Sequence, residues 1–212
     1  MSKYFNFFNK ILYDSVGDKT NYDEITNITT KFSFDESFKK NSIVFYQHSI
    51  TDGETPEMLA HKIYGSSERH WIILSLNNIV DPRLDWPVEQ RSLIDLIDKT
   101  YQSRANTANN QTGLSWARTN THSYYVQETQ TNQTNNKTIT VNRIDAGTYA
   151  NTSIATQTLT TPSGSTITIE TNKYLMTYYE YEVEQNDEKR IIKILKPEYA
   201  PLVEQEFRQV FK

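Results

Sequence analysis

Helix start and stop signals are densest between residues 52 and 82, and they restrict this stretch to two short helices after a turn. Thr55 is a favourable N-cap residue for the first helix, and Gly65 can adopt the left-handed conformation that ends one. A second helix can begin near Ser67. The pair Asn77–Asn78 is suited to end it, because asparagine tolerates the left-handed conformation.

Extended segments are predicted on both sides of the two helices. Residues 42–49, SIVFYQHS, are rich in strand-forming side chains. After the turn that follows the second helix, residues 83–88, RLDWPV, are expected to return beside that first strand. The pattern therefore predicts a strand–helix–helix–strand unit, with a core formed where four side chains meet between the helices: Leu59, Ile63, Trp71 and Leu74.

Composition changes sharply after the first hundred residues. Between residues 101 and 172, Ser, Thr, Asn and Gln make up 40 of 72 residues and charged residues are sparse. Alternating runs such as KTITVNRI and STITIET, separated by turn signals at 135–136, 145–147 and 162–164, favour an inserted β-meander over a disordered loop. The segments we predict are 1–42, an N-terminal aromatic docking segment; 43–100, the two-helix unit; 101–172, the Thr/Asn-rich β insertion; and 173–212, a strand and a helix.

Bulk properties argue against several classes of partner. The net charge of −4 and the pI near 5.6 disfavour a nucleic-acid-binding surface, which requires clustered Lys and Arg. No segment approaches the roughly 18 consecutive apolar residues that a membrane span needs. The N-terminus lacks the apolar core of a signal peptide, so we expect the protein to stay where it is translated. Without cysteine, the fold must be stabilised by packing alone.

No recognised catalytic or metal-binding pattern occurs in the sequence. The H-E-x-x-H motif is absent, and no zinc-ligand spacing is present. The histidines are better explained as surface residues: His48, His61, His70 and His122. Paired carboxylates lie among Lys and Arg, as on solvated helix faces. We therefore predict no catalytic residue, metal, cofactor or small-molecule substrate, and no enzymatic activity.

The two ends of the chain are the best candidates for contacts with other proteins. The N-terminus carries four aromatic side chains within five positions, and the last helix, which begins at Pro197 or Pro201, carries an apolar stripe. Clusters of this kind anchor protein interfaces, but they can equally pack on the chain's own core. The candidate partner-binding residues are Tyr4, Phe5, Phe7, Phe8, Trp86, Leu202, Phe207 and Phe211.

The two-helix unit resembles a LysM module. The opening Gly-Asp-Thr of that family appears as Gly53-Glu54-Thr55, its helix-ending Tyr-Gly as Tyr64-Gly65, and its Leu-x-x-x-Asn-x-Ile as Leu74 to Ile79. The closing Tyr-Pro-Gly of many members is replaced by Trp86-Pro87-Val88. These departures fall in loops that contact N-acetylglucosamine polymers in sugar-binding members. They weaken the prediction of glycan binding more than the prediction of the fold.

A narrower resemblance covers more of the chain. The run from Asp52 to Pro87, with its His70-Trp71 pair and Asp85-Trp86-Pro87, is similar to baseplate wedge proteins with a LysM-like domain from T4-type contractile-tailed phages. The N-terminal YFNFFNKILYD, the HSYYV run and the ending from YYEYEVEQNDEKR to the last helix agree with that family. The resemblance covers residues 1–100 and 173–212, whereas 126–172 looks like a lineage-specific insertion.

The resemblance implies an α+β structural subunit without catalysis, built from a LysM-like βααβ unit, an inserted β-rich region and a C-terminal amphipathic helix. It implies that the protein joins other baseplate wedge proteins and helps neighbouring wedges close into a sixfold ring. It also implies assembly in the host cytoplasm and a final place in the virion tail baseplate. The alternative function is a soluble LysM protein that binds peptidoglycan or chitin.

Overall fold

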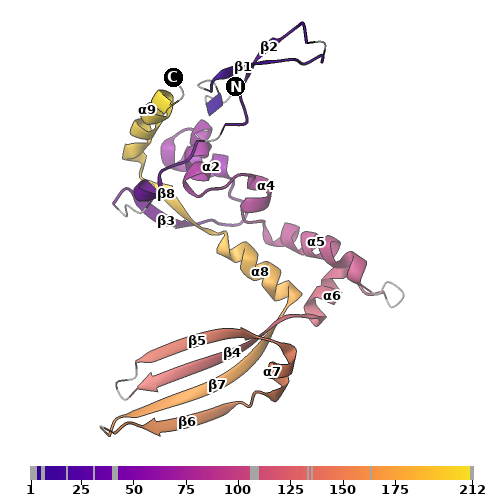
Figure 1. Cartoon of the computed structure of the whole chain (residues 1–212), viewed down its shortest axis with the longest axis vertical. Helices are drawn as coiled ribbons and strands as arrows, with labels where there is room; N and C mark the ends of the chain where they lie inside the picture. The colour runs from indigo at the N-terminus through magenta and orange to yellow at the C-terminus, as the bar shows by residue number, and fades with distance from the viewer. Residues whose placement is uncertain are drawn as a thin grey trace. The chain divides into compact units, whose positions relative to one another are not determined.

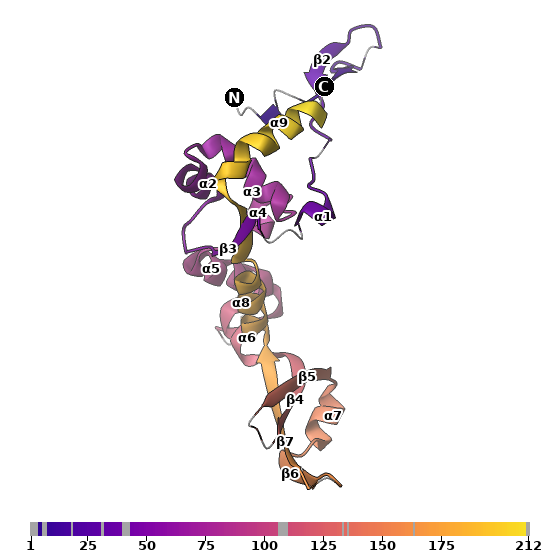
Figure 2. The same ribbon diagram turned by 90° about the vertical axis from the view of Figure 1, so that its left-hand side faces the viewer.

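The computed structural model shows an α+β protein that divides into two compact units (Figures 1 and 2). The first unit combines Met1–Glu89 with Asn186–Lys212, and the second comprises Gln90–Gln185. Within the described residues, no helix has the length and apolar character needed to cross a membrane. The structure describes residues 4–5, 8–17, 19–30, 32–39, 43–105, 110–132, 134, 136–162 and 164–210.

The first unit contains two small antiparallel sheets and several helices. One sheet is the hairpin of β1 and β2, and the other pairs β3 with β8. Its elements are β1 (Lys10–Tyr13), β2 (Asp23–Thr26), α1 (Glu36–Lys39), β3 (Phe45–Ser49), α2 (Pro56–Tyr64), α3 (His70–Leu76), α4 (Pro82–Asp85), β8 (Ile191–Leu195) and α9 (Ala200–Val210), with single 3₁₀ turns at Ser67–Arg69 and Pro197–Tyr199.

Helix α2 begins and ends where the local signals predict, and α3 ends there too, whereas Ser67, the expected start of the second helix, opens a 3₁₀ turn that leads into α3 at His70. The hydroxyl oxygen of Thr55 accepts a hydrogen bond from the Met58 N–H at 3.3 Å, and Gly65 ends α2 with φ of +70°. Asn77 caps α3, and Asn78 follows it in the left-handed region with φ of +57°. Short-range backbone and capping chemistry is sufficient to set these boundaries.

The closing strand of this unit is not the one that the sequence predicts. Residues 82–85 form helix α4, because the Asp81 carboxylate caps it by accepting a hydrogen bond from the Arg83 N–H at 3.0 Å. The partner of β3 is instead β8, with Phe45 opposite Leu195 and Ser49 opposite Ile191. The predicted return of residues 83–88 beside the first strand is therefore wrong. The strand comes from beyond the second unit.

The core of the first unit joins both ends of the chain to α2 and α3. Leu59, Ile72 and Ile73 are fully buried in it, and so is Ile194 from β8. The other buried members are Phe8, Phe34, Val44, Phe45, Ile50, Ala60, Tyr64, Trp71, Leu76, Trp86, Ile192, Leu195, Ala200, Val203 and Phe207. Ile63 and Leu74 are partly buried against this cluster. Burial of these side chains supplies the main driving force for folding of the unit.

The second unit combines four α-helices with a four-stranded sheet. Its elements are α5 (Gln90–Tyr101), α6 (Gly113–Thr119), β4 (Thr121–Asn132), β5 (Lys137–Ile144), α7 (Ala146–Asn151), β6 (Ala155–Thr160), β7 (Thr166–Thr177) and α8 (Tyr178–Glu188), with a 3₁₀ turn at Gln102–Arg104. Helix α5 and helix α6 approach closely, because the N–H of Gly113 donates to the Gln102 side chain at 3.1 Å. The N–H of Leu114 donates to the Asp98 carboxylate at 2.8 Å.

The middle zone is β-structure, as its alternating runs predict, but it is not a meander. The antiparallel strand order is β5-β4-β7-β6. The first and last strands in the sequence, β4 and β7, therefore pair at the centre of the sheet, with β5 beside β4 and β6 beside β7. The turn predicted at 145–147 is the start of α7, which Asp145 caps. This helix covers part of one face of the sheet (Figure 2): Tyr149 contacts Tyr124, and Lys173 donates to the Tyr149 carbonyl at 2.8 Å.

We predict that most of this sheet is dispensable for folding of the rest of the chain. Val126 and Lys173 are cross-strand partners, so replacing 127–172 with an Asn-Gly turn leaves a short hairpin with native register. Few side chains of the removed strands are buried. The shortened protein is expected to stay soluble, with cooperative melting by circular dichroism. Loss of soluble protein would contradict this prediction.

Candidate interaction site

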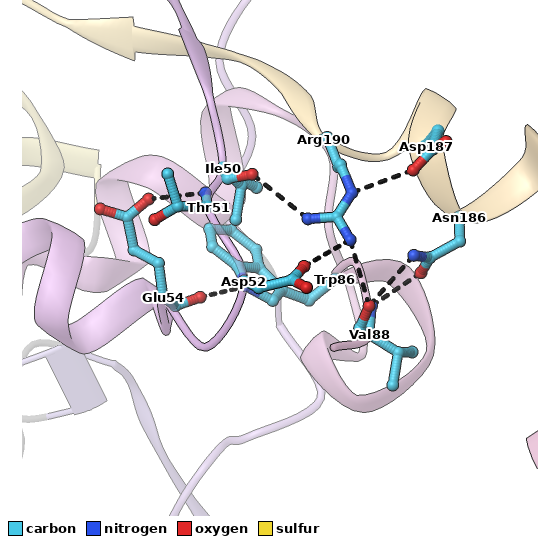
Figure 3. Close-up of polar contacts among 9 residues, drawn as sticks. All are labelled: Ile50, Thr51, Asp52, Glu54, Trp86, Val88, Asn186, Asp187 and Arg190. Carbon is cyan, nitrogen blue, oxygen red and sulfur yellow. Dashed lines mark hydrogen bonds and ion pairs between the residues drawn. The ribbon is translucent and has the colours of Figure 1, made fainter. Parts of the chain in front are cut away.

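The turn that precedes α2 is tied to the start of β8 by charged hydrogen bonds (Figure 3). The Arg190 guanidinium lies 2.6 Å from the Asp52 carboxylate and donates through Nε to Asp187 at 3.0 Å. Two longer contacts reach the carbonyls of Ile50 at 3.4 Å and Val88 at 3.5 Å. Partly buried, charge-assisted bonds of this kind fix the turn to the strand.

A buried asparagine holds together the points where the chain leaves and re-enters the first unit. The chain leaves after Glu89 and returns at Asn186, whose side chain is only 4% exposed. Its Oδ1 accepts from the Val88 N–H at 2.7 Å, and its Nδ2 donates to the Val88 carbonyl at 3.0 Å. One side chain therefore satisfies both backbone groups of Val88 (Figure 3).

Replacing this amide is expected to weaken the first unit. Asn186→Ala leaves the N–H of the partly buried Val88 without its partner, which costs about 2 kcal/mol of unfolding free energy. Urea unfolding of the purified variant measures the loss. The control is Asn172→Ala, at an exposed position, which should change stability little. Equal midpoints for the two variants would contradict the structural role of Asn186.

Trp86 and Glu54 stabilise the loop before α2, which contains Gly53-Glu54-Thr55 and corresponds to a sugar-contacting loop of LysM modules. Trp86 is buried, and its indole N–H donates to the Glu54 carbonyl at 2.8 Å. The Glu54 carboxylate lies 3.0 Å from His48 Nε2 and 3.7 Å from Lys62 Nζ, and it accepts from the Thr51 N–H at 3.3 Å. Burial raises the pKa of Glu54, but these hydrogen bonds and charges outweigh burial and lower its pKa overall. The polar groups of this loop are engaged within the unit.

The two ends of the chain meet in one aromatic cluster. The Phe207 ring lies 5.2 Å from that of Tyr4, 5.9 Å from that of Phe8 and 4.7 Å from that of Trp71. Phe8 and Phe207 are 4% and 2% exposed. For these two side chains, and for Trp86, the structure shows packing in the chain's own core, which is the alternative that the sequence left open.

Other candidate partner-binding residues remain accessible. Phe5 is 44% exposed and Leu202 is 54% exposed, whereas Tyr4 is partly buried. Phe7 and Phe211 lie outside the described residues. An ion pair secures α9 beside α2 and α3: Arg69 donates to Glu204 through Nε at 2.7 Å and through Nη2 at 3.2 Å. Leu202 is therefore presented to solvent on an anchored helix.

Titratable side chains of the described residues do not gather into a metal site. No group of three or more His, Cys, Asp or Glu is placed to hold a metal ion in the described part of the chain. His122 stacks on Tyr181 at 3.9 Å between ring centroids, and burial lowers its pKa. His48 is paired with Glu54, and His70 contacts the Ser67 carbonyl at 2.9 Å. These contacts are structural.

Comparison with known proteins assigns the family. The sequence model described as base plate wedge protein 53 matches residues 3–201, a span that includes the middle zone. The chain belongs to the base plate wedge protein 53 family. No curated protein matches it. As a base plate wedge protein it is a structural component of a phage tail baseplate, and its partners are other baseplate proteins. The resemblance inferred from the sequence is confirmed at the level of the family.

The surface of this wedge protein includes an apolar hairpin that the sequence analysis did not single out. In Figures 1 and 2, β1 and β2 project beyond α9 and α2. The hairpin and its flanks expose large apolar side chains, and a two-stranded hairpin is only marginally stable alone in water. The sequence feature that indicates this surface is the β1 segment KILY, which has apolar residues on both faces of the strand. The exposed side chains are Ile11, Leu12, Tyr13, Val16, Tyr22, Ile25 and Ile28.

Proposed function

We propose that this wedge protein joins neighbouring wedges into the sixfold ring of a contractile phage tail baseplate, with assembly in the host cytoplasm. The observation that carries the proposal is the projecting β1–β2 hairpin. Leu12, Val16 and Ile28 are 71%, 74% and 72% exposed, and Phe5 borders the same region with Ile28. Apolar side chains exposed together mark surfaces that another protein covers. Membership of a baseplate wedge family makes other baseplate proteins the partners.

We further propose that β3, α2, α3 and β8 form a LysM-like unit that serves as a scaffold for protein docking and does not bind a sugar polymer. This proposal is supported by the contacts that occupy the polar and aromatic side chains around the loop before α2. Asp52 is paired with Arg190, the Glu54 carboxylate is paired with His48, and Trp86 is buried under the same loop. A glycan site needs free polar groups and an accessible aromatic surface, and these groups are engaged inside the unit.

The residues proposed to contact partners are those on the surface: Phe5, Leu202 and the hairpin side chains. For Phe207 we expect an effect on folding instead of an effect on partner binding. Because it is 2% exposed, Phe207→Ser should unfold the first unit, so it cannot separate docking from folding. Leu202→Ser, at a position that is 54% exposed, should leave folding intact and weaken co-purification with the wedge partners.

Reconstitution of the ring from purified wedge proteins tests the proposal. The triple variant Leu12→Ser, Val16→Ser and Ile28→Ser removes exposed apolar contacts, so we expect normal melting but no closed rings by negative-stain electron microscopy. The matched control changes two exposed side chains elsewhere in the first unit, Met58→Ser and Leu84→Ser, and should allow ring closure.

Two results would contradict the proposed function. The first is ring closure by the hairpin variant at the rate of the control. The second is retention of the wild-type chain on peptidoglycan or chitin without binding to any wedge protein, which would favour the glycan-binding alternative. The wild-type chain is expected to be absent from the glycan fraction and present in baseplates of intact virions.

A further inference from the structure

The outer edge of β8 is closed by side chains of the same unit. Asn77 Nδ2 donates to the Lys193 carbonyl at 2.8 Å, and Asn77 Oδ1 accepts from the Lys193 N–H at 2.8 Å. The Tyr64 hydroxyl donates to the Leu195 carbonyl at 3.0 Å. These side chains occupy hydrogen-bonding positions that a third strand on this side would use. Strand addition at β8 is therefore blocked.

The direction of the β3 backbone follows from its pairing with β8. Just past the end of β3, the Ile50 N–H donates across the pair to the Arg190 carbonyl at 2.8 Å. Bonded and non-bonded pairs alternate along an antiparallel ladder, so the even-numbered residues of β3 direct their N–H and C=O groups toward β8. The N–H and C=O groups of Phe45, Gln47 and Ser49 consequently face away from the sheet.

In the described part of the chain, this outward edge of β3 has no strand partner. Among the described residues, no hydrogen bond reaches the backbone of Phe45, Gln47 or Ser49, and the side chains of Gln47 and Ser49 are exposed. The strand FYQHS contains no Lys, Arg, Asp, Glu or Pro. Natural edge strands usually carry such residues, because these prevent unwanted pairing.

The contrast with other edges favours β3. The hairpin strands carry Lys10 and Glu24 as an ion pair at 3.0 Å, and β5 carries Lys137 and Arg143. Strand β6 is also uncharged, but its side chains are mostly exposed and are not part of a packed core. By contrast, β3 is anchored by the buried Phe45, so its edge is held in place before a partner arrives. Such preorganisation lowers the entropy cost of binding.

We propose that β3 accepts an extended segment of another baseplate protein as a third strand. Only an extended backbone presents donors and acceptors with the two-residue spacing of Phe45, Gln47 and Ser49. The family assignment makes other baseplate proteins the molecules that meet this edge. Tyr46, which is 40% exposed, provides an apolar surface beside the added strand. The inference rests on the proposed function and adds the mode of contact.

A proline substitution tests the edge directly. Gln47→Pro removes an outward N–H while keeping every hydrogen bond between β3 and β8, and proline is tolerated on strand edges. The purified variant should melt like the wild type, and its binding to the wedge should fall about tenfold, as expected for a lost backbone hydrogen bond. The matched control, Gln47→Ala, keeps the N–H and should bind normally.

Hydrogen exchange provides a second measurement that does not depend on how the proline variant folds. In the isolated wild-type chain, the amides of Phe45, Gln47 and Ser49 should exchange quickly. In the wedge complex they should become protected. Protection already present in a dimer of the purified chain would overturn the assignment to a baseplate partner.

The failure of this inference can be told apart from the failure of the proposed function. Wild-type incorporation into the baseplate with equal binding by Gln47→Pro and Gln47→Ala would overturn the strand addition alone. Unprotected edge amides in the wedge complex would overturn it as well. Absence of the wild-type chain from baseplates would overturn the proposed function itself.

Discussion

Gly113→Ala is expected to unfold the second unit, at a cost of about 3 kcal/mol or more in unfolding free energy. A Cβ at this position would overlap the Asp98 carbonyl oxygen and lie 2.6 Å from the Gln102 backbone nitrogen. Both atoms belong to the backbone at the end of α5, so they cannot move aside like the tip of a side chain. The change therefore forces α6 away from α5.

Peptide-level hydrogen exchange measures this effect, because the loss of protection should concentrate in residues 90–185. The matched control is Gly147→Ala in α7, where the added Cβ meets only the exposed Asp145 carboxylate at 3.1 Å. That carboxylate can shift slightly, so the control should change stability by about 0.5 kcal/mol or less. Wild-type protection in Gly113→Ala would show that α6 does not approach the backbone of Asp98 and Gln102 closely.

Trp71→Ala is expected to cost about 3–5 kcal/mol in the first unit, because a large buried ring is replaced by a cavity. The indole is 7% exposed, and it touches Phe207 from the C-terminal helix, Tyr4 from the N-terminus and Phe32. Its removal therefore weakens the packing of both ends of the chain on α3.

A circular-dichroism melt checks the expected loss for Trp71→Ala. Leu84→Ala is the control, since Leu84 is 69% exposed on α4 and its truncation leaves no cavity. Trp71→Phe should lie between the two, because a smaller ring retains part of the contact. A midpoint for Trp71→Ala that matches the control would mean that the ring is not in the core.

The candidate partner-binding residues show where sequence periodicity is insufficient. The apolar stripe of α9 was expected to include Leu202 and Phe207, but only Phe207 faces the core, with Val203 one turn earlier. Both side chains are equally apolar in the sequence. They are five positions apart, which places them on different sides of a helix, so burial of Phe207 leaves Leu202 facing solvent. A stripe wider than the buried face leaves some members exposed.

The domain boundaries show the same limit. Composition marks residues 101–172 because their side chains are polar, whereas the second unit extends from Gln90 to Gln185. Helices α5 and α8 carry the charged and apolar residues that the Thr/Asn-rich zone lacks, so composition separates them from the sheet. The Tyr101 hydroxyl donates to Glu182 at 2.7 Å and joins the two helices, and the stack of Tyr181 on His122 joins α8 to β4. Contacts of this kind cannot be recognised from the amino-acid composition of a segment.

By itself, the sequence determined the features that depend on near neighbours. The caps of α2 and α3, the strands of the middle zone and the family motifs rest on residues a few positions apart, and such interactions form in the same way wherever the segment lies. The tertiary structure alone decided that β8 closes the first unit, that Asn77 blocks its outer edge, and that Phe207 is buried. Those outcomes depend on contacts between residues more than a hundred positions apart, which compete with equally favourable local alternatives and are resolved only when the core packs.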